Sequence, residues 1–393
     1  MRRHLLRVHR WAGIVLAGFL VLAGATGSFL AFHHEIDAAF VPELHEVSPQ
    51  PTRASLDAIA AEIEAANPRL TVAYFVFSQH ADKALRAVLN TREAAQSGRL
   101  DREGAGQAEI YVDPYSGRVL GERRWGEIGA TRAHVVPMVY RLHMSLFAGT
   151  VGQWITGIVA ALWIAAMAIG IVLAIPRLRH WRTAFSIKWR SSRARVLFDL
   201  HRTVGLGGFA VLAVIAFTGL YMNLPSVIEP AVSAIAPFTP RPAPVRAPGA
   251  LRSDVWRIGW DAAYASARHL EPSHPLAVIG RVEARGYYQV RFMPPDDIMD
   301  AGTIRFFVDG RDGSVLGRLD DRRGTLGDLI RIWQFPLHSG QGFGLPGRIL
   351  VCFAGVLPLL LAATGLWLWM RRRRLRELRT APTRTRAGWM TKL

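Results

Sequence analysis

Four long apolar segments constrain the fold of this 393-residue chain more than any other feature. They cover residues 11–32, about 147–175, about 204–224 and 349–370, and each has roughly the 20 apolar residues that a helix needs to cross a bilayer. The first segment continues into HHEID at 33–37 without a small-residue cleavage site, so we expect a retained helix rather than a removed signal peptide. The sequence therefore predicts a membrane α-helical protein with four transmembrane helices.

The net charge of +18 is distributed in a way that indicates orientation. Four Arg precede the first apolar segment, seven Lys or Arg and no acid lie in 176–195, and nine Lys or Arg with one acid follow residue 370. The positive-inside rule puts these three pieces, and both termini, on the cytoplasmic side of a bacterial inner membrane. Because topology explains this charge, we expect the basic segments to meet the lipid bilayer and expect no nucleic-acid partner.

Two long segments between the spans then face the periplasm. Each begins with a short amphipathic helix, LDAIAAEIEAANP or WDAAYASARHLEP, and continues with alternating strands around a glycine turn, AEIYVDPYSGRVLGE or IRFFVDGRDGSVLGR. These patterns predict two α+β modules, the second after a Pro-rich spacer. The expected division is 1–34 (cytoplasmic N-terminus and first span), 35–142 (first module), 143–176 (second span), 177–195 (basic loop), 196–225 (third span), 226–337 (spacer and second module), 338–370 (fourth span) and 371–393 (basic tail).

An internal repeat relates the two halves of the chain. At an offset of 192 residues, His9-Arg10, Gly13 and Thr26-Gly27 align with His201-Arg202, Gly205 and Thr218-Gly219. At an offset of 195, Leu142-His143, Gly152 and Gly170 align with Leu337-His338, Gly347 and Gly365, and at 196 the strand motif at 112–121 aligns with 308–317. The predicted unit is a span, an outer module and a span, used twice in the same orientation, unlike an inverted-repeat transporter.

Only two histidine pairs among the 13 histidines are matched by this repeat. His9 and His201 begin the first and third spans on the cytoplasmic side, and His143 and His338 precede the second and fourth spans on the outer side. An approximate two-fold axis would turn each histidine toward its equivalent, which is the geometry of two imidazoles on one iron, formed twice. Imidazole-only ligation suits haem better than zinc or copper. Because Cys352 is the single cysteine and no CxxCH occurs, we expect two non-covalent haem b groups.

Four further residues fit such a group. Gly13 and Gly205 lie one helical turn inward from their histidines, where a side chain would collide with a flat macrocycle. Arg10 and Arg202 lie at the depth expected for haem propionates. A single histidine at a helix mouth is more often an interfacial residue bonded to water or a carbonyl, but a matched quartet in a membrane favours function.

His33 and His34 have no equivalents in the repeat, and we rank them as second-choice ligands. Adjacent helix positions point about 100° apart, so at most one of the two faces the bundle. No Ser-His-Asp order, P-loop or strand-associated GxGxxG is present, so catalytic residues stay unassigned and electrons must come from quinol or another membrane donor.

In combination, HRWAG at 9–13, TGSFLAFHHEID at 26–37, the Leu-His before the second span and VDPYSGRVLG at 112–121 resemble the PepSY-associated transmembrane family, over roughly residues 4–375. The resemblance implies an inner-membrane protein tied to iron uptake, since characterised members include dihaem reductases of ferric siderophores. The ligands that it implies are His9, His201, His143 and His338.

We therefore expect an inner-membrane haem b oxidoreductase, a ferric-siderophore reductase that releases Fe(II) for uptake. Two alternatives stay open. One is a non-enzymatic signalling or assembly protein, because PepSY modules also occur as protease-inhibiting or regulatory domains. The other is a permease for iron, haem or copper.

Overall fold

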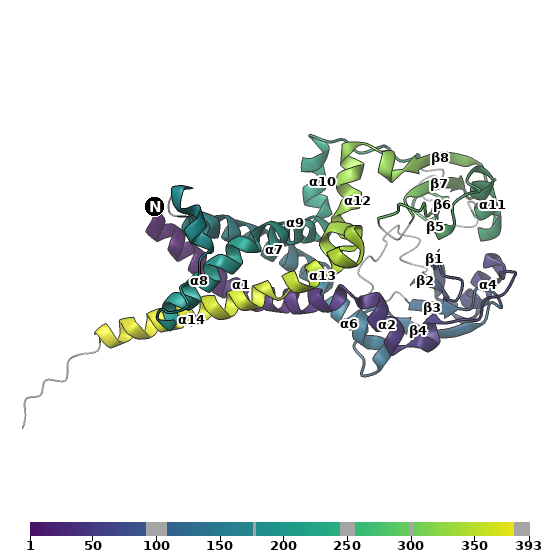
Figure 1. The fold of residues 1–393 in the computed structure, drawn as a ribbon. Helices are drawn as coiled ribbons and strands as arrows, with labels where there is room; N and C mark the ends of the chain where they lie inside the picture. Colours follow the sequence, from purple (N-terminus) through teal and green to yellow (C-terminus); the bar gives the residue numbers. More distant parts are fainter. Residues whose placement is uncertain (92–107, 176–177, 244–255, 299–301, 381–393) are drawn as a thin grey trace, which may run out of the picture. The chain divides into compact units, whose positions relative to one another are not determined.

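A computed structural model describes residues 1–91, 108–175, 178–243, 256–298 and 302–380. The described chain combines long apolar helices with one antiparallel sheet (Figure 1). Its helices are α1 (Arg2–Leu30), α2 (His33–Phe40), α3 (Pro42–His45), α4 (Leu56–Ala66), α6 (Arg132–Ser145), α7 (Gly149–Ala174), α8 (Arg193–Gly207), α9 (Phe209–Asn223), α10 (Pro225–Ser233), α11 (Trp260–Leu270), α12 (Leu326–Ser339), α13 (Gly344–Ala354) and α14 (Leu357–Thr380). Its strands are β1 (Leu70–Val76), β2 (Leu85–Thr91), β3 (Ala108–Val112), β4 (Val119–Arg124), β5 (Leu276–Val282), β6 (Tyr287–Phe292), β7 (Ile304–Asp309) and β8 (Val315–Asp320), and the 3-10 helices are η1 (Leu178–Phe185), η3 (Asp321–Arg323) and η4 (Gln341–Phe343).

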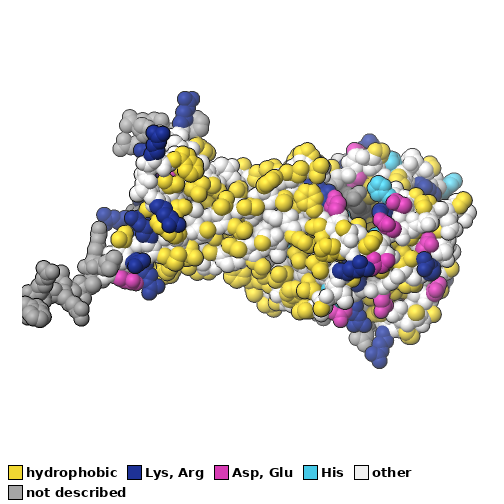
Figure 2. Space-filling view, turned by 60° about the horizontal axis from the view of Figure 1, so that its bottom comes forward, with side chains coloured by type: hydrophobic (Ala, Val, Ile, Leu, Met, Phe, Trp, Pro, Cys, Tyr) yellow, Lys and Arg dark blue, Asp and Glu magenta, His cyan; other side chains and the backbone are white. Residues whose placement is uncertain are grey.

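Three helical stretches are long and apolar enough to cross a membrane: α1, α7 and the stretch Gln341–Glu377 that contains α13 and α14. Helices α8 and α9 pass the same test as a pair, although they are bent by 61° at a short break. Hydrophobic side chains cover these helices on the face drawn in Figure 2, whereas Lys and Arg gather beside the amino terminus and the end of α14. The chain thus has the apolar helices of a multi-pass membrane protein.

The packing divides the chain into two compact units. The first comprises Met1–Ala25, Ala161–Ala213 and Phe353–Leu393, and the second comprises Thr26–Ala160 and Val214–Cys352. The first unit contains the amino-terminal part of α1, the carboxy-terminal part of α7, and all of α8 and α14, and the second contains the sheet with the helices around it. His9 and His201 lie in the first unit, and His143 and His338 lie in the second.

The second span begins later than the sequence predicts. We expected it to start near Phe147, but α6 ends at Ser145, and Leu146 and Phe147 both have positive φ angles of 52° and 58° before α7 begins. A Cβ atom on Gly152 would lie 1.6 Å from the carbonyl oxygen of Ser145, so the chain can turn this closely only over a glycine. His143 therefore lies on a separate helix that precedes the apolar one.

The second copy makes an equivalent turn. Helix α12 ends at Ser339, Gly340 has a φ of +79°, and a Cβ atom on Gly347 would lie 2.2 Å from the carbonyl oxygen of Gly340. His338 thus also precedes its apolar helix, as His143 does. Gly152 and Gly347, which the repeat aligns, thus have the same role: each lacks a side chain that would collide with a nearby backbone carbonyl.

The outer segments form one sheet rather than two. Its strand order is β4-β3-β2-β1-β5-β6-β7-β8, and all neighbours are antiparallel. Strands β1 and β5 join the two four-stranded meanders through the pairs Tyr74↔Gly280, Phe75↔Ile279 and Val76↔Val278. Helices α4 and α11 cover the sheet (Figure 1) and bury a single core with it, in which Trp260 is 1% exposed. The two predicted α+β modules therefore share one core.

The helices α4 and α11 cap each other at their amino ends. The Asp57 carboxylate of α4 accepts hydrogen bonds from the backbone N–H groups of Trp260 and Asp261 at 2.6 and 3.2 Å. In return the Asp261 carboxylate of α11 accepts from the N–H groups of Leu56 and Asp57 at 3.1 and 3.2 Å. Carboxylates satisfy the free N–H groups of a helix start and oppose its dipole favourably, so this exchange fixes the two helices against each other.

A buried ion network ties α2 to the edge of the sheet. Arg123 on β4 donates two hydrogen bonds of 2.9 Å to Asp37 on α2 and one of 3.0 Å to Glu109 on β3, and its side chain is 3% exposed. Burial opposes ionisation of Asp37, but hydrogen bonds from His45 and Arg123 outweigh it and lower the pKa of Asp37 to about 2. The segment that follows the first span is thereby held to the sheet by a charge pair.

Candidate metal-binding histidine pairs

The first unit brings the imidazole rings of His9 on α1 and His201 on α8 close together. Their ring centroids are 6.3 Å apart, and the ring planes are 81° apart. Two metal–nitrogen bonds of about 2 Å, together with the distance from each nitrogen to its ring centre, add up to about 6 Å. The separation therefore admits one metal ion between the two imidazoles.

The second unit repeats this arrangement with His143 of α6 and His338 of α12. Their ring centroids are 6.0 Å apart, with an angle of 61° between the planes. Each pair joins one histidine from each half of the chain. The two pairs that the sequence repeat matched are thus the two pairs that the fold brings together.

One glycine packs against each of these four rings. A Cβ atom on the glycine would lie 3.1 to 3.2 Å from the Cε1 atom of the histidine, closer than ordinary carbon contacts of about 3.5 to 4.0 Å. The glycine and histidine partners are Gly170 with His9, Gly365 with His201, Gly27 with His143 and Gly219 with His338. Any side chain at these positions would push the ring away from its helix, and thus change its distance from the opposite histidine.

The Nδ1 atom of each ring has a hydrogen-bond partner on the neighbouring helix. These bonds join His9 to the Ala166 carbonyl (3.0 Å), His201 to Thr364 Oγ1 (2.9 Å), His143 to Thr26 Oγ1 (2.8 Å), and His338 to Thr218 Oγ1 (3.0 Å) and the Ile215 carbonyl (3.1 Å). A metal-ligating histidine commonly uses its second ring nitrogen in this way, which sets the ring orientation. Nε2 is then the nitrogen that a metal would take.

A cavity of about 260 Å³ lies beside His9 and His201 in the first unit, and these two histidines are called the inner pair below. All six residues predicted for an inner cofactor line it: His9, Arg10, Gly13, His201, Arg202 and Gly205. A Cβ atom on Gly13 would meet nothing within 4 Å, and one on Gly205 would meet only Leu361, at 3.7 Å. Both glycines therefore leave open space in the cavity, as a flat ligand against the helices would require.

The charges around this cavity are of one sign. Its described lining includes three arginines, Arg10, Arg202 and Arg372, and no Asp or Glu, while most of the remaining residues are apolar. Such a lining fits a flat apolar ligand that carries carboxylates at one edge. Sequence reasoning missed Arg372, because it belongs to a run of arginines that the positive-inside rule already explained.

Arg202 has a second role that the sequence did not indicate. Its guanidinium donates to the backbone carbonyls of Thr183, Ala184 and Ser186 at 2.9 to 3.1 Å and lies 3.0 Å from the buried carboxylate of Asp199. These bonds anchor the loop around η1 to α8. Of the two predicted propionate partners, Arg202 is therefore already engaged with the chain itself.

His33 and His34, the second-choice ligands, do not form a pair like those of the four matched histidines. His33 and His34 on α2 stack on each other with centroids 3.9 Å apart, His33 lies 6.4 Å from Tyr140, and its Nδ1 atom bonds the Leu30 carbonyl at 2.8 Å. Two adjacent residues stacked in this way do not face each other across a space for a metal. Their side chains therefore have no metal-binding geometry of their own.

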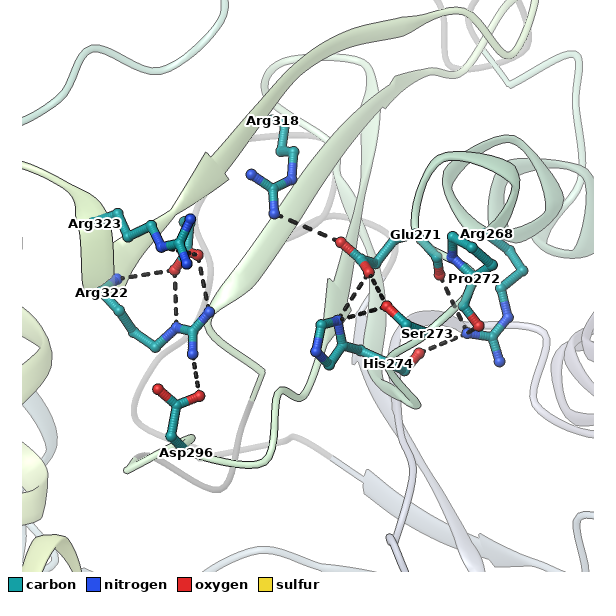
Figure 3. Close-up of polar contacts among 10 residues, drawn as sticks. Arg268, Glu271, Pro272, Ser273, His274, Asp296, Arg318, Arg322 and Arg323 are labelled. Atoms are coloured by element: carbon teal, nitrogen blue, oxygen red, sulfur yellow. Dashed lines mark hydrogen bonds and ion pairs between the residues drawn. The ribbon is translucent and has the colours of Figure 1, made fainter.

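Several other histidines have structural partners. His274 follows α11, and Figure 3 shows its ring at the Glu271 carboxylate, which also accepts from Ser273 and pairs with Arg318. His45 similarly bonds Asp37 at 3.1 Å. Within the described residues, no group of three or more His, Cys, Asp or Glu side chains could hold a metal ion.

Sequence reasoning assigned no role to the threonines and glycines that hold the rings. The repeat nevertheless contained the signal, since Thr26-Gly27 aligns with Thr218-Gly219 and Gly170 aligns with Gly365. From sequence alone, aligned small residues in apolar helices indicate helix packing, because the side chain that they contact is not known. Only the fold shows that each of them contacts a histidine.

Comparison with known proteins gives the same family as the sequence motifs. Residues 6–372 match the PepSY-associated TM region, which is nearly the whole chain. The uncharacterized protein PA4219 of Pseudomonas aeruginosa is 30% identical over 262 residues, which cover 60% of this chain and 63% of that protein. The chain thus spans less than two thirds of that relative. The family match, extending over all the apolar helices and both histidine pairs, shows that this chain belongs to the PepSY-associated transmembrane family.

Proposed function

We propose that this protein is a haem b oxidoreductase of the bacterial inner membrane, with both termini in the cytoplasm, that transfers electrons across the membrane to a periplasmic ferric siderophore. Its span–module–span unit would occur twice, giving four crossings. The observation that carries the proposal is that two histidine pairs, each with one member from each half of the chain, face each other at 6.3 and 6.0 Å. Family membership is consistent with this reading but does not fix the activity.

The chain's own residues would bind and orient two haem groups. His9 with His201 would hold one haem and His143 with His338 the other, and Gly13 and Gly205 would leave room for the group beside the inner pair. Arg10 and Arg372 would neutralise acidic groups at the cavity edge. A haem iron with two axial histidines supplies one-electron transfer, and the protein tunes it through axial ligands, burial and hydrogen bonding.

The electron balance of this activity requires a reductant and an acceptor. One quinol, oxidised to quinone with release of two protons, would supply two electrons, and each electron would reduce one Fe(III) chelate to Fe(II). Hard oxygen ligands hold Fe(II) less firmly than Fe(III), so reduction would release iron for uptake. Non-covalent haem is required because the single cysteine, Cys352, excludes thioether attachment through CxxCH.

Absorption spectroscopy of the purified protein tests the proposal. Expressed with added haem precursor and purified in detergent, the protein should show a Soret band and low-spin features that correspond to two haem groups per chain. His143→Ala and His338→Ala should each remove one of the two, and His9→Ala and His201→Ala should each remove the other. His33→Ala and His34→Ala serve as controls that keep both. A colourless protein, or haem retained by all four ligand variants, would refute it.

The absorption spectrum, a transport assay and a reduction assay together separate the alternatives. A signalling or assembly protein would be colourless and would tolerate His→Gln at all four positions. A permease for iron, haem or copper would show transport into proteoliposomes without any reductant. Reduction of a ferric siderophore by the quinol-supplied protein, lost in His143→Ala and kept in His33→Ala, would establish the enzyme reading.

A further inference from the structure

Three of the four paired histidines are bonded by a threonine that directly precedes the glycine packed on the same ring. The Thr–Gly pairs are Thr26-Gly27 at His143, Thr218-Gly219 at His338 and Thr364-Gly365 at His201. The threonines come from α1, α9 and α14, so one device recurs on three different helices. A single Thr–His bond could be incidental, but its recurrence with the adjacent glycine indicates a requirement of the site.

Two of these threonines can only accept the histidine's proton. Thr364 Oγ1 donates its hydrogen to the Leu360 carbonyl at 2.6 Å, and Thr218 Oγ1 donates to the Val214 carbonyl at 2.7 Å. A hydroxyl has one hydrogen, and once this is committed only its lone pairs remain for the imidazole. The Nδ1 atoms of His201 and His338 must therefore carry the proton, which makes Nε2 the lone-pair nitrogen that binds a metal.

The fourth position departs from this pattern. The repeat aligns Ile169 with Thr364, and Ile169 precedes Gly170, which packs on His9. Isoleucine has no hydroxyl, and the Nδ1 atom of His9 bonds the backbone carbonyl of Ala166, three residues before Ile169. His9 thus has the glycine and the backbone acceptor without the threonine.

We propose that Thr26, Thr218 and Thr364 are positioning residues that fix the tautomer and orientation of three ligand histidines, and that Ile169 leaves His9 as the less firmly held ligand of the inner pair. The identity of the bound group as haem rests on the proposed function. The tautomers of His201 and His338 do not, because they follow from hydrogen bonds within the chain. Outer partners of a ligand histidine typically change metal affinity by about 10- to 100-fold.

The experiment combines a measurement on haem-free protein with one on loaded protein. In ¹⁵N-histidine-labelled protein without haem, with His9, His201 and His338 assigned by His→Gln variants, NMR should find the proton on Nδ1 at His201 and His338. Thr364→Val should move the Nδ1–H resonance of His201 toward that of His9. In loaded protein, Thr364→Val should speed loss of the inner haem about tenfold, and Ile169→Thr should slow it relative to Ile169→Val.

A matched control is Thr203→Val, which removes a hydroxyl in the same unit that bonds the Ala184 carbonyl at 3.4 Å and no histidine. A proton on Nε2 at His201 in the wild type would overturn the inference. It would also fail if Thr364→Val changed neither the resonance nor haem loss, or if Thr203→Val changed both equally. A protein with Nδ1–H rings that never takes up haem would remove the proposed function while keeping the tautomer assignment.

Discussion

Replacing Gly365 by alanine tests whether His201 stands at a metal-binding distance from His9. The added Cβ atom would lie 3.2 Å from Cε1 and 3.6 Å from Nδ1 of His201. Because carbon atoms pack at about 3.5 to 4.0 Å, the ring would have to retreat by about 0.3 to 0.8 Å. Functional constellations tolerate displacements of about 0.5 Å. We expect the inner haem to bind about 10- to 100-fold more weakly, which corresponds to about 1.4 to 2.8 kcal/mol.

Two glycines of α1, Gly18 and Gly13, provide comparison variants for Gly365→Ala. A Cβ atom on Gly18 would meet nothing within 4 Å, so Gly18→Ala should leave haem binding unchanged and add about 1 kcal/mol of helix stability. Gly13 also has open space around it, but that space belongs to the cavity beside His9, so Gly13→Ala should reduce haem content. The assay is haem content and haem-loss rate in the His143→Ala background, which isolates the inner pair.

The reasoning predicts that Gly365→Ala and Gly13→Ala lose haem and that Gly18→Ala keeps it. If Gly365→Ala binds haem as the wild type does, the contact between this glycine and His201 does not set the ligand position. If Gly18→Ala loses as much haem as Gly13→Ala, the effect comes from general disturbance of α1, and the cavity argument fails. Only loss confined to the two variants at the site supports the geometry.

Three further predictions concern charges in both units. Asp37→Asn should destabilise the second unit by about 1 to 3 kcal/mol, because it removes one of the two carboxylates that pair with the buried Arg123 and leaves only Glu109; thermal unfolding measures this. In the wild type the pKa of Asp37, about 2, lies below its ordinary value of about 3.9, so its stabilisation is complete above about pH 4 and lost as the pH falls through about 2, a dependence absent in Asp37→Asn. Asp261→Ala and Asp57→Ala should each cost about 0.5 to 2 kcal/mol in the same assay, since each removes a helix cap, and the double variant should show non-additivity. Arg10→Gln should weaken retention of the inner haem, and unchanged retention would remove Arg10 from the list of cofactor contacts.

Local patterns in the sequence predicted the local structure well. The amphipathic stretches at 56–68 and 260–272 form α4 and α11, and the alternating stretches on either side of the Gly117 and Gly313 turns form β3 with β4 and β7 with β8. These elements are visible because their hydrophobic period is a property of a few neighbouring residues. The positions of His143 and His338 just before apolar helices follow from the same kind of reading.

Non-local features could not be predicted in this way. Nothing in the residues of β1 indicates that it pairs with β5 across some 200 residues, because an edge strand and a central strand can carry the same pattern. The turn at Leu146 and Phe147 was missed because these residue types rarely take positive φ, and the cause is a glycine several residues later, Gly152. The ring contacts of Thr364 and Gly365 likewise need the position of His201, which only the fold supplies.

The proposed duplication would account for the pairing of the histidines, but not for the differences between the two pairs. Each pair takes one member from each half, so a strict repeat would give the two ligands of one metal identical surroundings. A strict repeat would still allow the two pairs to differ from each other, because one pair lies on α1 and α8 and the other on α6 and α12. Ile169 opposite Thr364 breaks the equivalence within the inner pair, and the arginine-only charge of the cavity distinguishes that pair by the group it can accept. In the proposed function, a difference in reduction potential between the two sites would favour transfer in one direction, and ligand surroundings and burial set such a difference. The positions where the two copies diverge around the rings are therefore where that inequality should be sought, by exchanging the residues of one copy for those of the other.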